Sequence, residues 1–167
     1  MHVRAELPSD VEAVHELNRT AFGGADEAQI VDALRGAVVP LVSLVADTDG
    51  TVVGHILFSP VTPASTPHPL LMGLAPMAVR PDHQRSGVGS ALVRAGLDAC
   101  RKMGAVGVVV VGHPTYYPRF GFVPASRFGL SCAFDVPDEV FMALELTPGA
   151  LATHTGQVRF HSAFGGA

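Results

Sequence analysis

Apolar residues recur at helical spacing in two segments near the N-terminus of the chain. The first pattern covers Val11–Ala21 and stops at Gly23, which predicts an amphipathic helix. Ser9 or Asp10 is expected to cap this helix, because their side-chain oxygens accept hydrogen bonds from the free amides of a first turn. A second helix is predicted over Asp26–Arg35, where the same spacing continues.

The pattern then changes to the shorter period of β-strands. Leu41–Asp47 and Thr51–Ser59 are rich in β-forming residues and are joined by Thr48-Asp49-Gly50. Because Asp-Gly is a strong hairpin signal, these segments are predicted to pair. Four prolines within Pro60–Pro69 predict a loop, and Leu70–Arg80 is predicted to form the next strand.

The second half of the chain mixes helical and strand patterns. A helix is predicted over Gly87–Met103 and a short one over Thr115–Phe120. Between them, the β-branched run Val106–Val111 is typical of a strand covered on both faces. Further strands are expected near Leu130–Phe134, Val140–Leu146 and Gln157–Phe160. Since no repeat or linker divides the pattern, residues 1–167 are predicted to form a single domain of the α+β (α/β mixed) class.

Composition narrows the class of partner. The chain has 167 residues, of which 48% are hydrophobic and 16% charged, as in a compact globular protein. A net charge of −4 argues against nucleic acid as a partner, because phosphate backbones are held by clustered Lys and Arg. No apolar run is long enough to cross a bilayer, so no membrane partner is expected.

Cysteine and histidine usage argues against a metal site. Cys100 and Cys132 form no CxxC pair, and the eight histidines include no HExxH motif or Cys/His cluster. The N-terminal residues lack the layout of a secretory signal, so a reduced, cytoplasmic protein is the expectation.

The strongest chemical signal is the segment that joins a predicted strand to the long helix. Gln84-Arg85-Ser86-Gly87-Val88-Gly89-Ser90 places two glycines at the start of that helix. Glycine allows close approach of a ligand to the backbone, and the free amides and dipole of a first helical turn suit a diphosphate. The segment matches neither GxxxxGK[ST] nor GxGxxG. A bare GxG of this kind more often marks only a tight strand-to-helix turn.

The flanking residues resemble the GNAT superfamily of N-acetyltransferases, and specifically its YhbS-like predicted branch. Residues 84–89 fit the family pattern Gln/Arg-x-x-Gly-x-Gly/Ala at every position. The resemblance implies a mixed, mostly antiparallel sheet of about six to seven strands flanked by about four helices, splayed on either side of the cofactor helix. It also implies that the amides of Arg85 through Ser90 hold the pyrophosphate of acetyl-CoA.

The preceding strand carries a second match to the family. Leu74-Ala75-Pro76-Met77-Ala78-Val79-Arg80-Pro81 is similar to a Leu-x-Pro-Leu-Ala-Val-x-Pro strand of that branch. Pro76 lacks an amide hydrogen, so a bulge or edge is expected there. The resemblance implies that Met77, Ala78 and Val79 contact the cofactor, with their amides near the thioester carbonyl.

The third match supplies a candidate acid. Tyr117-Pro118-Arg119-Phe120-Gly121-Phe122 resembles the family's Tyr-x-x-x-Gly-Phe element. The resemblance implies that Tyr117 protonates the departing thiolate and that Phe120 contacts the cofactor. Tyr116 is the competing choice, and either tyrosine could also be a plain core aromatic.

A base is harder to identify, because residues 70–79 contain no carboxylate. An ammonium with a pKa near 10.4 must lose a proton before it attacks. His113, at the end of the Val-rich strand, is the preferred candidate, and His55 on an earlier strand is the alternative.

The expected activity is direct transfer of an acetyl group from acetyl-CoA to a primary amine in a ternary complex. The acceptor is a small-molecule or peptide amine, and a homodimer is left open. A non-catalytic acyl-CoA-binding or regulatory module is one alternative. An acyltransferase with a longer acyl-CoA, its pocket lined by Pro60–Pro69, is another.

Overall fold

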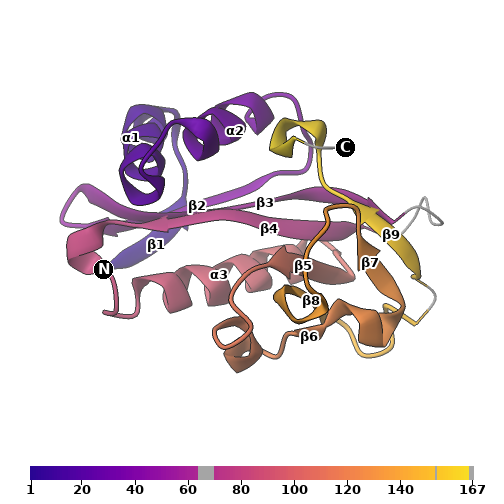
Figure 1. Cartoon of the computed structure of the whole chain (residues 1–167). Helices are drawn as coiled ribbons and strands as arrows, with labels where there is room; N and C mark the ends of the chain where they lie inside the picture. The colour runs from indigo at the N-terminus through magenta and orange to yellow at the C-terminus, as the bar shows by residue number, and fades with distance from the viewer. Residues whose placement is uncertain (64–69, 153, 166–167) are drawn as a thin grey trace. The chain divides into compact units, whose positions relative to one another are not determined.

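The computed structural model describes residues 1–63, 70–152 and 154–165 (Figure 1), and the chain divides into two compact units. Unit 1 comprises Met1–Ser59 and Ala75–Gly96, and unit 2 comprises Pro60–Leu74 and Leu97–Ala167. Strands β3 (Thr51–Pro63) and β4 (Leu71–Val79) and helix α3 (Val88–Lys102) each contribute residues to both units. The prediction of a single domain is not tested by this division and stays a prediction.

Unit 1 is built on an antiparallel sheet with helices on both faces. Strand β1 (His2–Ala5) pairs with β2 (Val42–Thr48), which pairs with β3. The predicted hairpin is confirmed: Thr48 pairs with Thr51, and both loop residues have positive φ, 51° at Asp49 and 86° at Gly50.

Two consecutive residues of β3 face opposite sides of this sheet. A Cβ at Gly54 would contact Val88 and Leu92 of α3, whereas His55 contacts Asn18 of α1 (Val11–Phe22). Helix α2 (Asp26–Leu34) packs beside α1, and Figure 1 shows this helix pair on the side of the strands opposite α3. Period-2 alternation therefore separates two packing faces along one strand.

Close packing of α3 on the sheet requires glycine at one helical position. A Cβ at Gly96 would fall inside the contact distance of the Phe58 ring, which is fully buried. The large ring fills the space left by the missing side chain, which fixes the height of the helix above the strand.

Unit 2 has a sheet in two parts. Residues Leu71–Gly73 of β4 pair in parallel with β5 (Gly107–Val111), which pairs antiparallel with β8 (Phe141–Glu145), and β8 pairs with the two-residue strand β6 (Val123–Pro124). The end of β3 pairs antiparallel with β9 (Gly156–Arg159), which pairs in parallel with β7 (Leu130–Cys132).

One buried cluster forms the core of unit 2. Its members come from both parts of the sheet and from the loops between them: Val61, Leu71, Val109, Ala125, Leu130, Phe141, Ala143, Leu151, Val158 and Phe160. A Cβ at Gly73 would meet Val61 and Phe160 at 2.8 and 2.7 Å, so this core also depends on a missing side chain.

Short 3-10 helices connect these elements. They are η1 (Pro8–Asp10), η2 (Pro81–His83), η3 (Tyr117–Phe120), η4 (Ala125–Phe128), η5 (Asp138–Val140) and η6 (Ser162–Phe164). The predicted helix over residues 115–120 therefore exists as η3, in the tighter form that short runs adopt.

The mixed, mostly antiparallel fold class is confirmed, and the number of elements is refined. In the described ranges there are nine strands and three α-helices, against the expected six to seven strands and four helices. The extra strands are short: β6 and β7 contain two and three residues.

Two local expectations are wrong. Asp10 precedes α1, but its carboxylate does not cap that helix: it accepts hydrogen bonds from the Leu7 amide at 2.7 Å and from Arg4. The predicted loop at Pro60–Pro69 begins later, because β3 continues to Pro63. The end of β3 pairs with β9 there, at an edge position where proline is tolerated. Residues 64–69 lie outside the described residues.

Candidate active site

The predicted phosphate-binding loop connects β4 to α3 within unit 1. It begins with η2, and its backbone then passes through positive φ at Arg85 (63°) and Gly87 (90°). A Cβ at Gly87 would meet no atom within 4 Å, so glycine is favoured there by backbone conformation and not by lack of space.

Side chains of the loop are engaged with the loop itself. Gln84 Nε2 donates to the Val79 carbonyl at 3.2 Å, and Ser86 Oγ donates to the His83 carbonyl. Asp82 accepts a hydrogen bond from Arg80 at 2.9 Å and lies 2.8 Å from a ring nitrogen of His83. Two backbone carbonyls and one carboxylate are thus the groups that hold the turn in its conformation.

Backbone amides are left open at the start of α3. Within the described ranges, the amides of residues 85–89 donate to no backbone carbonyl, and the Ala91 amide donates to the Gly87 carbonyl at 3.0 Å. Residues 84–87 are exposed, Gly89 and Ser90 are half-buried, and Val88 is buried. Amides without a backbone partner at the positive end of a helix dipole are the kind of donor that suits an anion.

The predicted thioester strand is the last part of β4. Ala78 is buried, at 3% exposure, whereas Met77 and Val79 are half-buried on either side of it. The Arg80 amide beyond them donates to the Val53 carbonyl of β3 at 2.8 Å, which anchors the strand end in unit 1.

Tyr117 lies in unit 2 against the end of β5. Its ring occupies the space where Gly112 would carry a side chain, and it forms an edge contact with Phe122 at 5.6 Å between centroids. Burial, with a smaller effect of Tyr116, raises the pKa of Tyr117 to about 12. The phenol is therefore protonated throughout the neutral range.

The other predicted residues of unit 2 are more accessible. His113 is exposed, and Phe120 is half-buried with its ring 5.4 Å from that of Tyr116. Tyr116 itself carries the Arg119 guanidinium 4.5 Å above its ring. Of the two tyrosines, Tyr117 is the more enclosed.

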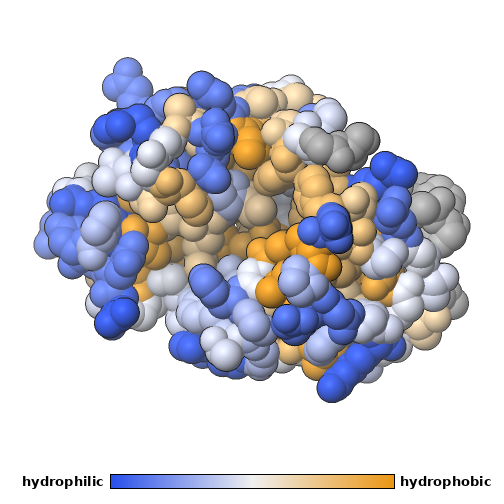
Figure 2. Space-filling model, in the orientation of Figure 1, coloured by the Kyte–Doolittle hydropathy of each residue, from blue (hydrophilic) through white to orange (hydrophobic). Residues whose placement is uncertain are grey.

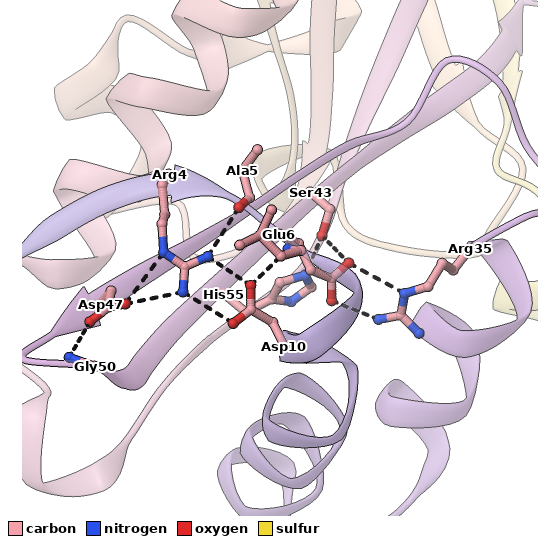
Figure 3. A network of polar contacts seen from close by, with 10 residues as sticks. Arg4, Ala5, Glu6, Asp10, Arg35, Ser43, Asp47, Gly50 and His55 are labelled. Carbon is pink, nitrogen blue, oxygen red and sulfur yellow. Dashed lines mark hydrogen bonds and ion pairs between the residues drawn. The ribbon is translucent and has the colours of Figure 1, made fainter.

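His55 belongs to a buried polar network in unit 1 (Figure 3). Asn18 Nδ2 lies 3.3 Å from His55 Nδ1 and donates to the Val14 carbonyl at 3.0 Å, which identifies Nδ2 as the donor. His55 Nδ1 therefore accepts, and Nε2 donates to Ser43 Oγ at 2.9 Å. The Ser43 hydroxyl in turn donates to Glu6 Oε1 at 3.0 Å.

Ion pairs complete this network at both ends. Glu6, which follows β1, pairs with Arg35, which follows α2, at 2.8 Å. Arg4 pairs with Asp10 at 2.7 Å and with Asp47 at 3.0 Å, which joins β1 to the helix start and to β2.

These surroundings favour a structural role for His55. The residue is 0% exposed, and burial together with the charge of Arg35 lowers its pKa to about 3. With so low a pKa, the ring is neutral at ordinary pH and is a poor acceptor for the proton of an ammonium group. The network was not recognised in the sequence, because its members are isolated polar residues, far apart along the chain, with no shared motif.

The predicted site residues thus divide between the units. Unit 1 contains Met77–Val79 and Gln84–Ser90, whereas unit 2 contains His113, Tyr117 and Phe120. In the described residues there is no group of three or more His, Cys, Asp or Glu side chains suited to a metal ion. A search of the same residues finds no helix with the length and apolar character needed to span a membrane.

Comparison with known proteins identifies the family. The model of the Acetyltransferase (GNAT) family matches residues 11–122, which include the loop and Tyr117. The uncharacterized N-acetyltransferase YjhQ of Escherichia coli is 40% identical over 158 residues, covering 90% of this chain and 87% of that protein. The chain belongs to the GNAT acetyltransferase family.

Solved GNAT structures agree with the fold. The crystal structure of YhbS from Escherichia coli in complex with CoA has 34% identity and a TM-score of 0.91, and the match covers 98% of this chain and 91% of that one. A GNAT acetyltransferase from Brucella melitensis in complex with acetyl-CoA has 36% identity and a TM-score of 0.81, with 98% and 97% covered. The predicted resemblance to the YhbS-like branch is confirmed.

Proposed function

We propose that this GNAT chain moves an acetyl group from acetyl-CoA to a primary amine by direct transfer in a ternary complex. The observation that carries the proposal is the row of amides at residues 85–89 that donate to no backbone carbonyl, at the start of α3 and beside the exposed residues 84–87. Two related structures contain CoA and acetyl-CoA, which supports the same ligand for this loop.

The loop and β4 hold the donor in this proposal. Amides of residues 85–90 bind the pyrophosphate, while Gln84 and Ser86 keep the loop in shape through their bonds to backbone carbonyls. Met77, Ala78 and Val79 contact the pantetheine arm, and an amide of this strand stabilises the oxyanion that develops on the thioester. Phe120 supplies an apolar contact to the cofactor.

The chemical step needs one acid and one base. The neutral amine nitrogen attacks the thioester carbon, the C–S bond breaks with its electron pair on sulfur, and Tyr117 Oη gives a proton to that thiolate. The phenolate then takes up the proton that the attacking nitrogen loses as the amide forms. His113 accepts the proton that the ammonium loses before attack, which its exposure allows. The raised pKa makes Tyr117 a weak acid. Transfer of its proton must therefore occur together with cleavage of the C–S bond.

Release of free CoA thiol with a panel of primary amines tests this activity. We expect acetyl-CoA to bind in a calorimetric titration and thiol to appear only when an amine is added. Tight acetyl-CoA binding without thiol release for every amine would instead support the non-catalytic module, which the absence of a carboxylate on β4 favours. Tighter binding of longer acyl-CoAs would support the other acyltransferase alternative.

A further inference from the structure

A hydrogen bond between two buried side chains connects α1 to β3 in the interior of unit 1. Asn18 and His55 are both 0% exposed, and Asn18 Nδ2 lies 3.3 Å from His55 Nδ1. Neither side chain takes part in the chemical step proposed above. Burial of two polar side chains at one interface therefore has a cause other than proton transfer.

Asn18 interrupts the apolar side of its helix. With Val14 and Leu17 it forms the buried side of α1, whereas Figure 2 shows mainly polar residues over the outer side of this helix. The spacing favours an apolar residue at this position. Asn18 Oδ1 is also buried and has no hydrogen-bond partner in the part of the chain that the structure describes. An unpaired buried acceptor lowers the stability of the folded state, so stability does not account for asparagine here, and such exceptions are expected at functional sites.

His55 lies beside the strand that is proposed to face the thioester. The Arg80 amide at the end of β4 donates to the carbonyl of Val53 near the start of β3, and the two strands are neighbours in the sheet. Since an end meets a start, the strands run antiparallel, and His55 lies opposite Ala78. Opposite side chains point to the same face of a sheet, which here is the face covered by α1.

The other face of the same strands belongs to the cofactor helix. A Cβ at Gly54, the residue before His55, would contact Val88 and Leu92 of α3. The loop proposed to bind the pyrophosphate leads into that helix. The bond between Asn18 and His55 therefore acts on β3 and β4 from the face away from the pyrophosphate loop.

The His55 ring is held at its second nitrogen as well. Nε2 donates to Ser43 Oγ on β2, and Ser43 donates to Glu6, as Figure 3 shows. Nδ1 is thereby left as an acceptor with one fixed direction. An apolar contact has no such direction, so this hydrogen bond defines the place of α1 over the strands more narrowly than apolar packing would.

We propose that Asn18 and His55 are positioning residues for acetyl transfer, and that their hydrogen bond fixes the distance between α1 and β4 at Ala78. The proposal rests on the proposed acetyl transfer. Neither residue contacts the reacting atoms in it. Because misplacement by about 1 Å can slow a reaction about 10²-fold, loss of this bond is expected to lower kcat.

An apolar pair at the two positions separates positioning from stability. In Asn18→Leu/His55→Met both polar partners are removed together, and Ser43 keeps its bond to Glu6. We expect a urea midpoint at or above that of the wild type and an unchanged KM for acetyl-CoA. With the fastest amine of the panel, kcat should be about tenfold lower or less. Leu57→Val is the matched control, because Leu57 is buried on the same face of β3, and its kcat should equal that of the wild type.

Two single variants identify the bond that matters. His55→Asn places an acceptor near the position of Nδ1 and should keep most of the kcat. His55→Gln places an amide near the position of Nε2, so it keeps the bond to Ser43, loses the bond to Asn18 and should lower kcat about tenfold. If the double variant does not fold, these two variants decide alone.

The outcomes distinguish the inference from the proposed function. Wild-type kcat in a folded double variant, or a lower kcat for His55→Asn than for His55→Gln, overturns the inference while acetyl transfer stands. An equal loss of kcat in Leu57→Val also overturns it, because any change at this interface would then have the same effect. If the wild type releases no thiol with any amine, the proposed function fails and the inference fails with it.

Discussion

At the scale of single residues, Tyr117 is the side chain whose chemistry can be isolated most cleanly. Tyr117→Phe keeps the ring that fills the space at Gly112 and removes only the hydroxyl. We expect kcat to fall by about 10²- to 10⁴-fold with little change in the KM for acetyl-CoA, since general acid catalysis contributes that much. Tyr116→Phe is the matched control. An unchanged kcat for Tyr117→Phe at every pH would exclude this acid.

His55 gives a second prediction at this scale, on stability against pH. Its pKa falls from 6.5 to about 3 on folding, so the unfolded chain takes up the proton first as the solution is acidified. The stability present above pH 6.5 is therefore lost as the pH falls toward 3, by at most about 1.4 kcal/mol per pH unit. Urea unfolding at several pH values measures this slope.

The variant His55→Gln should lose this part of the slope, whereas His2→Gln, at an exposed histidine, should keep it. Parallel slopes in the wild type and His55→Gln would show that the buried ring does not control acid stability.

At the scale of elements, the loop before α3 depends on backbone conformation. Gly87→Ala puts a Cβ at a φ of 90°, which costs about 1–3 kcal/mol wherever that conformation is retained. Either the open amides shift or the bound loop is strained, so acetyl-CoA should bind about tenfold or more weakly. Gly24→Ala is the control, because a Cβ there meets no atom within 4 Å and φ is not left-handed. Equal affinities of the two variants in calorimetry would argue against this loop as the cofactor site.

Elements were predictable where the sequence has a local cause. The Asp49-Gly50 hairpin and the end of α1 at Gly23 follow from residues that tolerate positive φ, and the loop follows from Gly87. By contrast, the role of Asp10 and the length of β3 are set by partners distant in sequence, Arg4 and β9. The two-residue strand β6 has no period to detect.

Site residues followed the same division. The loop, Tyr117 and Phe120 were found because a contiguous motif contains them. The network around His55 could not be found in this way, because Asn18, Ser43 and His55 come together only when α1 packs on the paired strands β2 and β3.

At the scale of the whole molecule, the two units are covalently continuous through β3, β4 and α3. A strand cannot keep half of its ladder when the other half unfolds without exposing backbone groups, so we predict that both units unfold in one transition. The chain contains no Trp and two Tyr, and both tyrosines lie in unit 2. Tyrosine fluorescence therefore reports on unit 2, while far-UV circular dichroism reports on the whole chain. Coincident urea transitions by the two probes are expected for the single domain of residues 1–167. A tyrosine transition displaced from the circular dichroism transition would show instead that unit 1 and unit 2 unfold separately.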